Sequence, residues 1–154
     1  MKLLTQILRE IGNIGRALDY ISNIEFKDIH LNKGKYLYLS RICENPGIIN
    51  DNLAKLVKND RTAVAKTVKR LEQEQLILKK ADSTNKKIRH LFVTQKGKKL
   101  YNYLQREEKY SSKQALANLS LKEQKQLLNL LKIVSSNVSY DWNFVRQGYK
   151  RNYE

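Results

Sequence analysis

The first 24 residues have the hydrophobic pattern of an amphipathic helix. Apolar side chains recur at alternating spacings of three and four residues, at Leu4, Ile7, Ile11, Ile14, Leu18 and Ile21. This spacing puts them on one stripe of a helix over about residues 2–24. The stripe is widened by Leu3, Leu8, Tyr20 and Ile24. A widened stripe on a leading helix favours packing against a second chain as well as against the domain itself.

The next stretch predicts a second helix and then a short third one. The second helix is expected to have Asn32 as its cap and to stop at Asn45-Pro46-Gly47. Asn50 or Asp51 can cap the third helix. The apolar positions of these two helices are Tyr36, Leu37, Leu39, Ile42 and Cys43, followed by Leu53, Ala54, Leu56 and Val57.

A fourth helix, from Arg61 to about Glu74, has one apolar and one basic side. Asp60 can cap it, and a single buried stripe is expected from Val64, Val68 and Leu71. The positions left largely on other faces are Thr62, Lys66, Thr67, Lys69 and Arg70. Two short helices joined by a tight turn, the second of them basic on its free side, are typical of a helix-turn-helix.

After this helix the period of the pattern changes. Two short apolar runs, at residues 76–78 and 91–93, flank a polar, turn-rich segment at 82–87, which predicts a β-hairpin, the wing of a winged helix-turn-helix. Thr94 can cap a long helix that runs from about Gln95 toward Asn118. A capping box at Ser120 opens a last helix that reaches about Val138. The aromatic residues that follow are expected to dock on the domain or on a partner chain: Tyr140, Trp142, Phe144, Tyr149 and Tyr153.

These elements predict a mainly α-helical fold with a small β-hairpin wing, as one domain over residues 1–154. Its winged helix-turn-helix core is expected at 31–110, with the helix-turn-helix at about 49–75 and the wing at about 76–93. About six helices and a hairpin cannot hide every apolar seam within 154 residues. We therefore expect a homodimer built from residues 1–30 and 112–154, through Leu4, Ile7, Ile11, Ile14, Leu127, Leu131 and Val134.

The charge is strongly positive and unevenly distributed. The chain has 30 Lys and Arg residues against 15 Asp and Glu, a net charge of +15. Residues 61–100 alone hold 12 basic and three acidic side chains, a net charge of +9. Such an excess favours a surface that meets an anion, of which the phosphate backbone of nucleic acid is the commonest. An anionic membrane surface is the competing partner, but this segment has no Trp for the bulky apolar face that membrane binding requires.

Composition narrows the class of protein further. A hydrophobic content of 41% excludes a purely disordered basic tail, and no apolar run approaches the length of a membrane span. The single cysteine, Cys43, excludes an intramolecular disulfide and fits a reducing, cytoplasmic environment. It lies among apolar residues, as a buried structural cysteine would. With only His30 and His90 besides, and no Gly-rich phosphate loop, we expect no catalytic residues, no metal site and no cofactor.

Several strings, in this order, resemble the MarR family of winged helix-turn-helix transcriptional regulators. Asn52-Leu53-Ala54-Lys55-Leu56-Val57 resembles the first helix of its motif. Asp60-Arg61-Thr62-Ala63-Val64-Ala65-Lys66 is similar to the start of its recognition helix, and Arg70-Leu71-Glu72 to its end. Val93-Thr94-Gln95-Lys96-Gly97 resembles the string that leads out of its wing. The likeness covers about residues 5–138.

The resemblance implies an obligate homodimer whose first and last helices interlock and which binds a pseudo-palindromic double-stranded DNA operator. The recognition helix would enter the major groove and the wing an adjacent minor groove. Many members repress nearby genes and release DNA when a small, often aromatic, compound binds. The recognition-helix contacts would fall on Arg61, Thr62, Lys66 and Arg70. From side-chain chemistry alone, arginine is the commonest reader of guanine, whereas Lys66 and Lys69 are expected to hold phosphate.

Two departures from the family pattern matter. The wing usually reads Asp-x-Arg-Asp-x-Arg, whereas residues 82–87 read Asp-Ser-Thr-Asn-Lys-Lys, without either arginine. Lys does not replace Arg in a narrow minor groove, so this wing is expected to hold chiefly phosphates, through Lys86, Lys87 and Arg89. Gln75 stands where the family commonly has a glycine that ends the recognition helix, which predicts a different helix end.

Three other functions stay open at this point. The arginine-poor wing and the high charge also suit a weakly specific architectural protein that coats AT-rich DNA. A protein–protein adaptor could keep the fold without binding DNA. A redox or metal sensor would act through Cys43 or through a metal.

Overall fold

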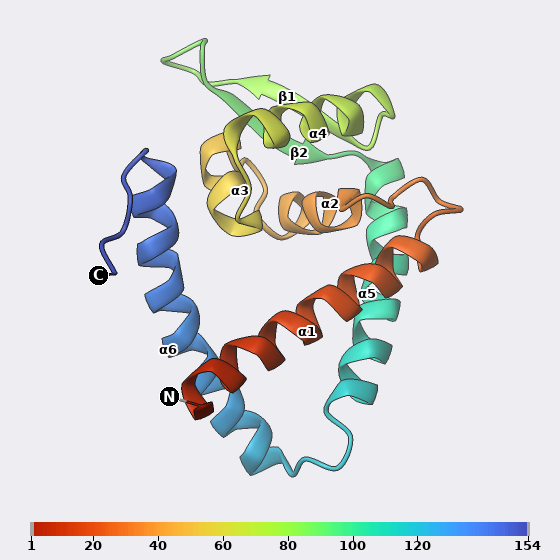
Figure 1. Ribbon diagram of the computed structural model, residues 1–154. Helices are drawn as coiled ribbons and strands as arrows, with labels where there is room; N and C mark the ends of the chain where they lie inside the picture. Colours follow the sequence, from red (N-terminus) through yellow and green to blue (C-terminus); the bar gives the residue numbers. More distant parts are fainter. Residues whose placement is uncertain (1, 154) are drawn as a thin grey trace. The chain divides into compact units, whose positions relative to one another are not determined.

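The computed structural model describes residues 2–153, which form two compact units, one up to Leu104 and one from Gln105 (Figure 1). No helix in the described part is both long and apolar enough to cross a membrane. Six helices and two strands follow in chain order: α1 (Lys2–Glu25), α2 (Lys35–Glu44), α3 (Asn50–Val57), α4 (Arg61–Gln73), β1 (Ile77–Ala81), β2 (Arg89–Val93), α5 (Gln95–Ala115) and α6 (Leu121–Arg146).

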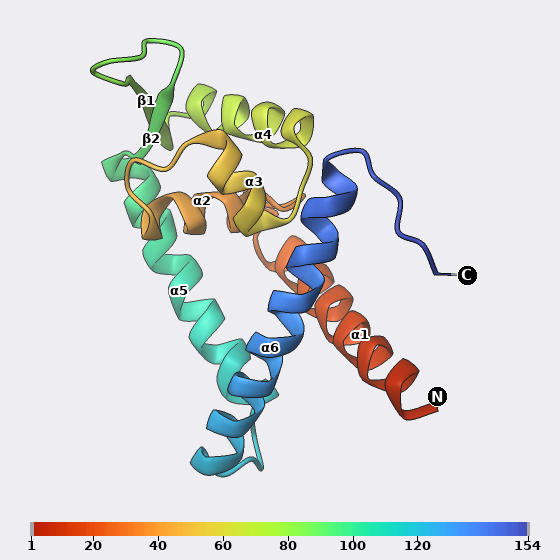
Figure 2. The ribbon, with the colours of Figure 1, turned by 90° about the vertical axis from the view of Figure 1, so that its left-hand side faces the viewer.

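The first unit has a single hydrophobic core. Its buried apolar side chains extend from Phe26, just after α1, to Leu104 in α5, and α4 contributes the predicted stripe. The main members are Phe26, Leu31, Leu39, Ile42, Leu53, Val64, Val68, Leu71, Ile77 and Leu91. This core holds α2, α3 and α4 together, and the hairpin of β1 and β2 extends beyond these helices (Figure 2).

The hairpin is antiparallel, and its register runs from the Ile77–Val93 pair to the Ala81–Arg89 pair. The connection between α2 and α3 pairs with β2 through backbone hydrogen bonds. The Gly47 N–H donates to the Leu91 carbonyl at 2.8 Å, and the Leu91 N–H donates to the Ile48 carbonyl at 2.9 Å. The base of the hairpin is therefore fixed to the helix-turn-helix by backbone hydrogen bonds.

The predicted start of α2 was wrong. Its N-cap is Gly34, in a left-handed conformation with φ +78°, and not Asn32. The side chain of Asn23 on α1 accepts a hydrogen bond from the Gly34 N–H at 3.1 Å. The α2 helix has no side-chain cap, and the bond that fixes its N-cap residue comes from 11 residues upstream, so neither leaves a local sequence signal.

The predicted cap of α3 was also wrong, by one residue. The N-cap is the extended residue Ile49, which makes no side-chain cap, so Asn50 and Asp51 lie in the first turn. Pairing of the neighbouring Ile48 with Leu91 keeps the chain extended up to this point. The negative charge of Asp51 in the first turn still interacts favourably with the positive end of the helix dipole.

The N-cap of α4 is the predicted one, but the prediction that Gln75 gives a different helix end was wrong. Asp60 accepts a hydrogen bond from the Ala63 N–H at 2.7 Å. At the other end Gln75 takes a left-handed conformation with φ +60°, although it is not a glycine. The Gln75 carbonyl accepts a 2.7 Å hydrogen bond from the Thr94 hydroxyl, and the Leu76 N–H donates to Leu71 at 3.0 Å. Tertiary bonds thus hold a turn that the residue itself disfavours.

The second unit consists of the rest of α5 and of α6. The predicted capping box is present, because Ser120 and Glu123 exchange hydrogen bonds of 3.2 and 2.7 Å. The Ser120 N–H lowers the pKa of the Glu123 carboxyl. However, α6 continues to Arg146 and does not stop near Val138, so three of the tail aromatics are helical: Tyr140, Trp142 and Phe144.

The segment after α6 folds back along its own helix. The Tyr149 ring stacks on Phe144 with centroids 5.1 Å apart. Arg151 forms an ion pair of 2.7 Å with Asp141. These contacts place part of the predicted aromatic tail on the helix that precedes it.

Candidate nucleic-acid interface

The outward face of α4 is polar and basic. A helix turns by about 100° per residue, so Thr62, Lys66, Lys69 and Gln73 lie within about 60° of arc. They are exposed and lie opposite the buried stripe of Val64, Val68 and Leu71. Arg61 and Arg70, both exposed, flank this face on its two sides. The N-terminal part of such a helix is the part that reaches base edges in helix-turn-helix proteins.

Most cations of this face have no carboxylate partner. Within the described residues, the side chains of Lys66, Lys69 and Arg70 form no ion pair, so their charge is available to an external anion. Arg61 differs, because its guanidinium lies 3.5 Å from Asp51 of α3 while its side chain is 82% exposed. At that exposure the pair is weak, and the guanidinium is free to reorient toward a ligand.

Several other lysines of the basic segment have structural partners. Lys79 pairs with Glu72 at 3.0 Å, and the Lys96 amine donates to the Glu74 carbonyl at 2.9 Å. The Lys80 amine lies over the Phe92 ring, 5.0 Å from its centroid. The excess charge of residues 61–100 therefore divides into lysines that hold the hairpin in place and cations that face solvent.

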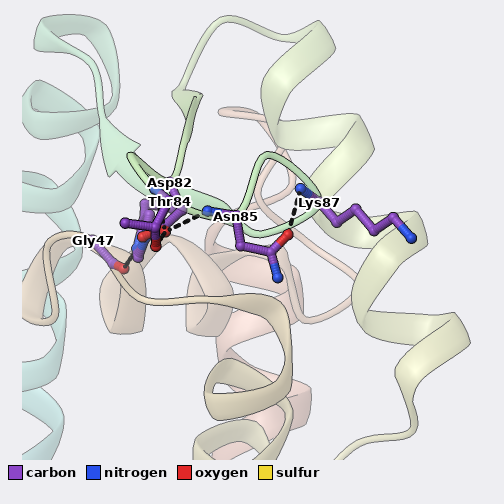
Figure 3. A network of polar contacts seen from close by, with 6 residues as sticks. Gly47, Asp82, Thr84, Asn85 and Lys87 are labelled. Atoms are coloured by element: carbon purple, nitrogen blue, oxygen red, sulfur yellow. Dashed lines mark hydrogen bonds and ion pairs between the residues drawn. The ribbon is translucent and has the colours of Figure 1, made fainter.

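The wing tip is a tight loop organised by one carboxylate (Figure 3). One oxygen of Asp82 accepts hydrogen bonds from the Thr84 hydroxyl and from the backbone N–H groups of Thr84 and Asn85, at 2.8, 3.1 and 3.0 Å. The Asn85 side chain then accepts from the Lys87 N–H at 3.1 Å. An amide oxygen is sufficient for that last bond, so replacing the family's second acid by Asn85 leaves the loop intact.

The cations predicted on the wing are all at its surface. Lys86 and Lys87 lie in the loop and Arg89 begins β2, and all three are exposed. The segment 82–88 contains no arginine that could insert into a narrow groove. This wing is suited to contacts with phosphate.

The other oxygen of Asp82 binds the ring of His90, on β2. The His90 Nε2 atom lies 2.8 Å from Asp82 Oδ1, and Nδ1 lies 2.7 Å from the Gly47 carbonyl oxygen. The Asp82 carboxylate and then the Gly47 carbonyl raise the pKa of His90 above its ordinary 6.5. In return His90, followed by the N–H donors of Asn85 and Thr84, lowers the pKa of Asp82 far below its usual range.

Each unit also has an apolar candidate surface, the seam on α1 in the first unit and the seam on α6 in the second. Leu4, Ile7 and Ile14 are exposed by 70%, 44% and 56%, and Leu127 and Leu131 by 38% each. Ile11 and Val134 are half-buried. Each helix leaves its predicted seam largely uncovered in the single chain, as a surface that meets another chain would.

Comparison with known proteins places the chain in a family. A family model described as MarR matches residues 31–88. The chain is 51% identical over 150 residues to YybA of Bacillus subtilis (strain 168), an uncharacterized HTH-type transcriptional regulator, covering 97% of this chain and all of that protein. The chain belongs to the MarR family.

Solved structures give the same assignment and the fold of this MarR-family chain. A Listeria monocytogenes protein assigned to the MarR family, in complex with 26mer DNA, is 48% identical, with a TM-score of 0.92 over 95% of this chain and 97% of that one. The transcriptional regulator SlyA is 52% identical, with a TM-score of 0.86 over 90% and 98% of the two chains. The predicted fold class, a winged helix-turn-helix, is confirmed, with α3 and α4 as the helix-turn-helix and β1 and β2 as the wing.

Sequence reasoning missed three residues of this candidate interface. Ala65 and Gln73 share the exposed side of α4 with the predicted contacts, and only their helical position indicates it. A methyl group such as that of Ala65 can contact the thymine methyl in the major groove. His90 has the pattern of an isolated histidine, because its partners lie 8 and 43 residues away in sequence.

Cys43 does not have the environment of a reactive thiol. Burial, and then the carboxylate of Glu44, raises its pKa to about 11, against an opposing effect of Lys98. A thiol with that pKa is almost entirely protonated at neutral pH, whereas a redox-sensing cysteine needs the thiolate. Across residues 2–153, no group of three or more His, Cys, Asp and Glu side chains could hold a metal ion.

Proposed function

We propose that this MarR-family chain is a homodimeric, sequence-specific, double-stranded DNA-binding transcriptional regulator. It acts as a repressor on a pseudo-palindromic operator in the cytoplasm, and a small aromatic effector releases it. The observation that carries this proposal is the outward face of α4. Thr62, Lys66 and Lys69 are exposed there, opposite a fully buried apolar stripe.

The roles of the interface residues follow from their chemistry. Arg61 and Arg70 are the candidates for reading guanine, because a guanidinium bonds two acceptors of the base edge at once. Thr62 contributes a hydroxyl that donates or accepts, and Lys66 and Lys69 hold phosphate. The wing adds phosphate contacts from Lys86, Lys87 and Arg89. The relative from Listeria that was crystallised with 26mer DNA supports the DNA ligand.

The homodimer follows from the apolar seams and from the geometry of operators. A dimer reads two half-sites when its recognition helices lie about 34–36 Å apart, which is one turn of DNA. An effector that binds a differently spaced form more tightly withdraws the dimer from DNA by its differential affinity. A panel of small aromatic compounds, tested for displacement of a labelled operator, checks this part.

The decisive experiment compares two duplexes of equal length. One carries a pseudo-palindrome from the DNA that flanks this protein's coding region, and the other is its scrambled sequence. At about 150 mM salt we expect the dissociation constants to differ by roughly 10³ or more. A smaller ratio contradicts sequence-specific regulation.

Single-residue variants show which side chains make the dissociation constants for the two duplexes differ. Arg61→Ala and Arg70→Ala are each expected to weaken operator binding by about 1–3 kcal/mol and to relax specificity at one base position. Lys79→Ala is the matched control, because Lys79 is also basic but is paired with Glu72. It should leave the ratio of the two dissociation constants unchanged.

A weakly specific architectural DNA-binding protein is the second candidate. It is favoured by the wing, where Thr84 and Lys87 stand in place of the family's two arginines. In the two-duplex assay it predicts nearly equal dissociation constants with a steep salt dependence. A protein–protein adaptor instead predicts that the double variant Arg61→Ala, Arg70→Ala leaves any DNA affinity unaltered.

A further inference from the structure

His90 has an oxygen acceptor at each of its ring nitrogens. Nδ1 faces the Gly47 carbonyl at 2.7 Å, and Nε2 faces the Asp82 carboxylate at 2.8 Å. A neutral imidazole has one N–H and can satisfy only one of the two acceptors, whereas the imidazolium donates to both. The geometry is therefore complete only when the ring is protonated.

The two acceptors belong to different parts of the winged unit. Asp82 is the residue that organises the wing tip, through the bonds of its other oxygen to Thr84 and Asn85. Gly47 lies in the connection between α2 and α3 (Figure 3). The ring of His90 thus joins the loop that presents Lys86 and Lys87 to the body of the helix-turn-helix.

We propose that His90 is a positioning residue for DNA binding: its imidazolium ties the wing tip to the α2–α3 connection, and loss of its proton loosens the wing. This inference rests on the proposed function, because it assigns the histidine a role in how that interface meets phosphate. The wing then binds DNA more tightly at a pH that keeps the ring charged.

Within the described residues, Asp82 is the only charged group that pairs with the His90 ring, because the other charged groups of the neighbouring elements have partners elsewhere. On β1, Lys80 is the cross-strand neighbour of His90, but its amine lies over the Phe92 ring. On α2, Glu44 pairs with Arg41 at 2.8 Å. On α3, Lys55 lies 3.4 Å from Asp51. His90 and Asp82 side chains are 32% and 25% exposed, so solvent can supply and remove the proton.

The direction of the pH effect follows from the two shifts. The pKa of His90 is raised, so its stabilising contribution is complete below the unfolded value near 6.5 and is lost as pH rises through the folded pKa. The pKa of Asp82 is lowered, so its contribution is lost only as pH falls through that low value. Across the neutral range, His90 alone decides whether the bridge is intact.

Protonation of His90 is expected to affect DNA binding, and DNA binding is expected to affect protonation of His90. When the ring is neutral, one acceptor loses its donor and the tip loop gains conformational freedom, which DNA must then remove on binding. Phosphates near the wing also favour the charged ring, and linkage requires protonation to favour DNA by the same factor. We expect operator affinity to fall by roughly tenfold across the titration, the effect of one charge-assisted hydrogen bond.

The first measurement is operator affinity from about pH 5.5 to about pH 8.5 at fixed ionic strength. The natural chain should lose affinity as pH rises. His90→Gln should give a flat profile, because a glutamine side chain does not titrate and its one N–H₂ group cannot donate to both Gly47 and Asp82. His30→Asn is the matched control, since His30 is the only other histidine and lies in a left-handed turn that Asn tolerates. It should keep the natural profile.

Asp82→Asn tests the mechanism through a change of sign. The amide oxygen can still accept from Thr84 and Asn85, while the amide N–H₂ now donates to Nε2 of a neutral ring. Nδ1–H keeps its bond to Gly47. The bridge is then complete when His90 is neutral, so affinity should fall as pH decreases instead of as it rises.

The imidazole titration of the free protein by NMR separates this inference from the proposed function. We expect His90 to titrate above 6.5 in the natural chain and below 6.5 in Asp82→Asn. A His90 value at or below 6.5 in the natural chain, or a natural pH profile of operator binding in His90→Gln, overturns the inference. Absence of operator binding at every pH contradicts the proposed function and with it any role of His90 in it, whatever value the ring titration gives.

Discussion

Gly97 lies in the first turn of α5, against the backbone that follows the recognition helix. A Cβ atom built on Gly97 would lie 2.2 Å from the Leu76 carbonyl oxygen and 2.8 Å from a methyl carbon of Val93. The same turn is capped by Thr94, whose hydroxyl accepts from the Gly97 N–H at 3.1 Å. Neither the backbone of Leu76 nor the capped turn can move aside without breaking hydrogen bonds.

Gly97→Ala is therefore expected to destabilise the fold by about 1–3 kcal/mol, the usual cost of forcing an extra carbon into a packed site. Urea denaturation followed by circular dichroism measures the free energy of unfolding. Lys99→Ala, on an exposed position two residues further along α5, is the control and should change it by less than about 0.5 kcal/mol. Equal stability of Gly97→Ala and the natural chain would mean that α5 shifts freely.

Gln75 presents the opposite case, a side chain where the backbone favours glycine. Its φ of +60° costs a non-glycine residue about 1–2 kcal/mol. A glycine at this position would avoid that cost, but it would lose more conformational entropy on folding, which cancels part of the gain. Gln75→Gly should raise the free energy of unfolding by about 0.5–1 kcal/mol in the same denaturation assay. Gln75→Ala keeps a Cβ atom and should show no such gain; equal effects of the two variants would refute the strain at this position.

At the residue scale, the sequence predicts a feature when the residues that cause it lie close together in the chain. Val64, Val68 and Leu71 were identified because a helix repeats its buried face at fixed spacing. The bridge through His90 was not, because it joins residues 47, 82 and 90, which meet only after the hairpin has paired with the α2–α3 connection. Gln75 was predicted to end α4 differently from the family's glycine, but it takes the left-handed conformation, because the distant Thr94 hydroxyl holds its carbonyl.

At the scale of elements, the wing and α4 present different chemical groups at their surfaces. The cations of the wing loop, Lys86 and Lys87, are exposed and unpaired by any carboxylate within residues 2–153, and a lysine holds phosphate without reading sequence. The α4 face also carries a hydroxyl, a methyl and two flanking arginines. Affinity and specificity should therefore separate between the two elements.

The double variant Lys86→Gln, Lys87→Gln tests this separation. Removing one lysine–phosphate interaction lowers the slope of log affinity against log salt by about 0.9, so the slope should fall by about 1.8 in the double variant. Operator and scrambled duplex should weaken by the same factor, which fluorescence anisotropy at several salt concentrations can measure. Lys79→Gln removes one charge from the same hairpin and should leave the slope nearly unchanged, because that lysine is paired with Glu72. A weakening confined to the operator would assign base reading to the wing.

Element boundaries were predictable where the capping group is adjacent in sequence. Asp60 and the Ser120–Glu123 box were identified because each cap lies within three residues of the group it binds. The starts of α2 and α3 were misplaced: neither has a side-chain cap, and the backbone near them is hydrogen-bonded to Asn23 and Leu91, far away in sequence. The extent of α6 was underestimated because its polar and aromatic last turns lack a clear apolar seam.

At the scale of the whole molecule, charge and apolar surface impose different requirements. The winged unit has its own core, but α6 has no fully buried residue and α1 has only Ser22. A second copy that covers these seams would remove apolar surface from water and bring the assembly's net charge to +30. In the proposed dimer, two basic faces would bind one DNA molecule, and its phosphates would offset the repulsion between the two positively charged copies.

The double variant Ile7→Glu, Leu131→Glu is expected to convert a dimer into a monomer, because it buries carboxylates without partners in an apolar interface. Size-exclusion chromatography with light scattering should give a mass near 18.1 kDa for this variant and twice that for the natural chain. Leu56→Glu is the control: it adds a charge at another exposed leucine, on α3, and should stay dimeric. The monomer should retain the helical circular dichroism of the winged unit yet lose operator affinity, since one recognition helix then reads one half-site. A natural chain that is monomeric at micromolar concentration, or a double variant that stays dimeric, would contradict a dimer held by these seams.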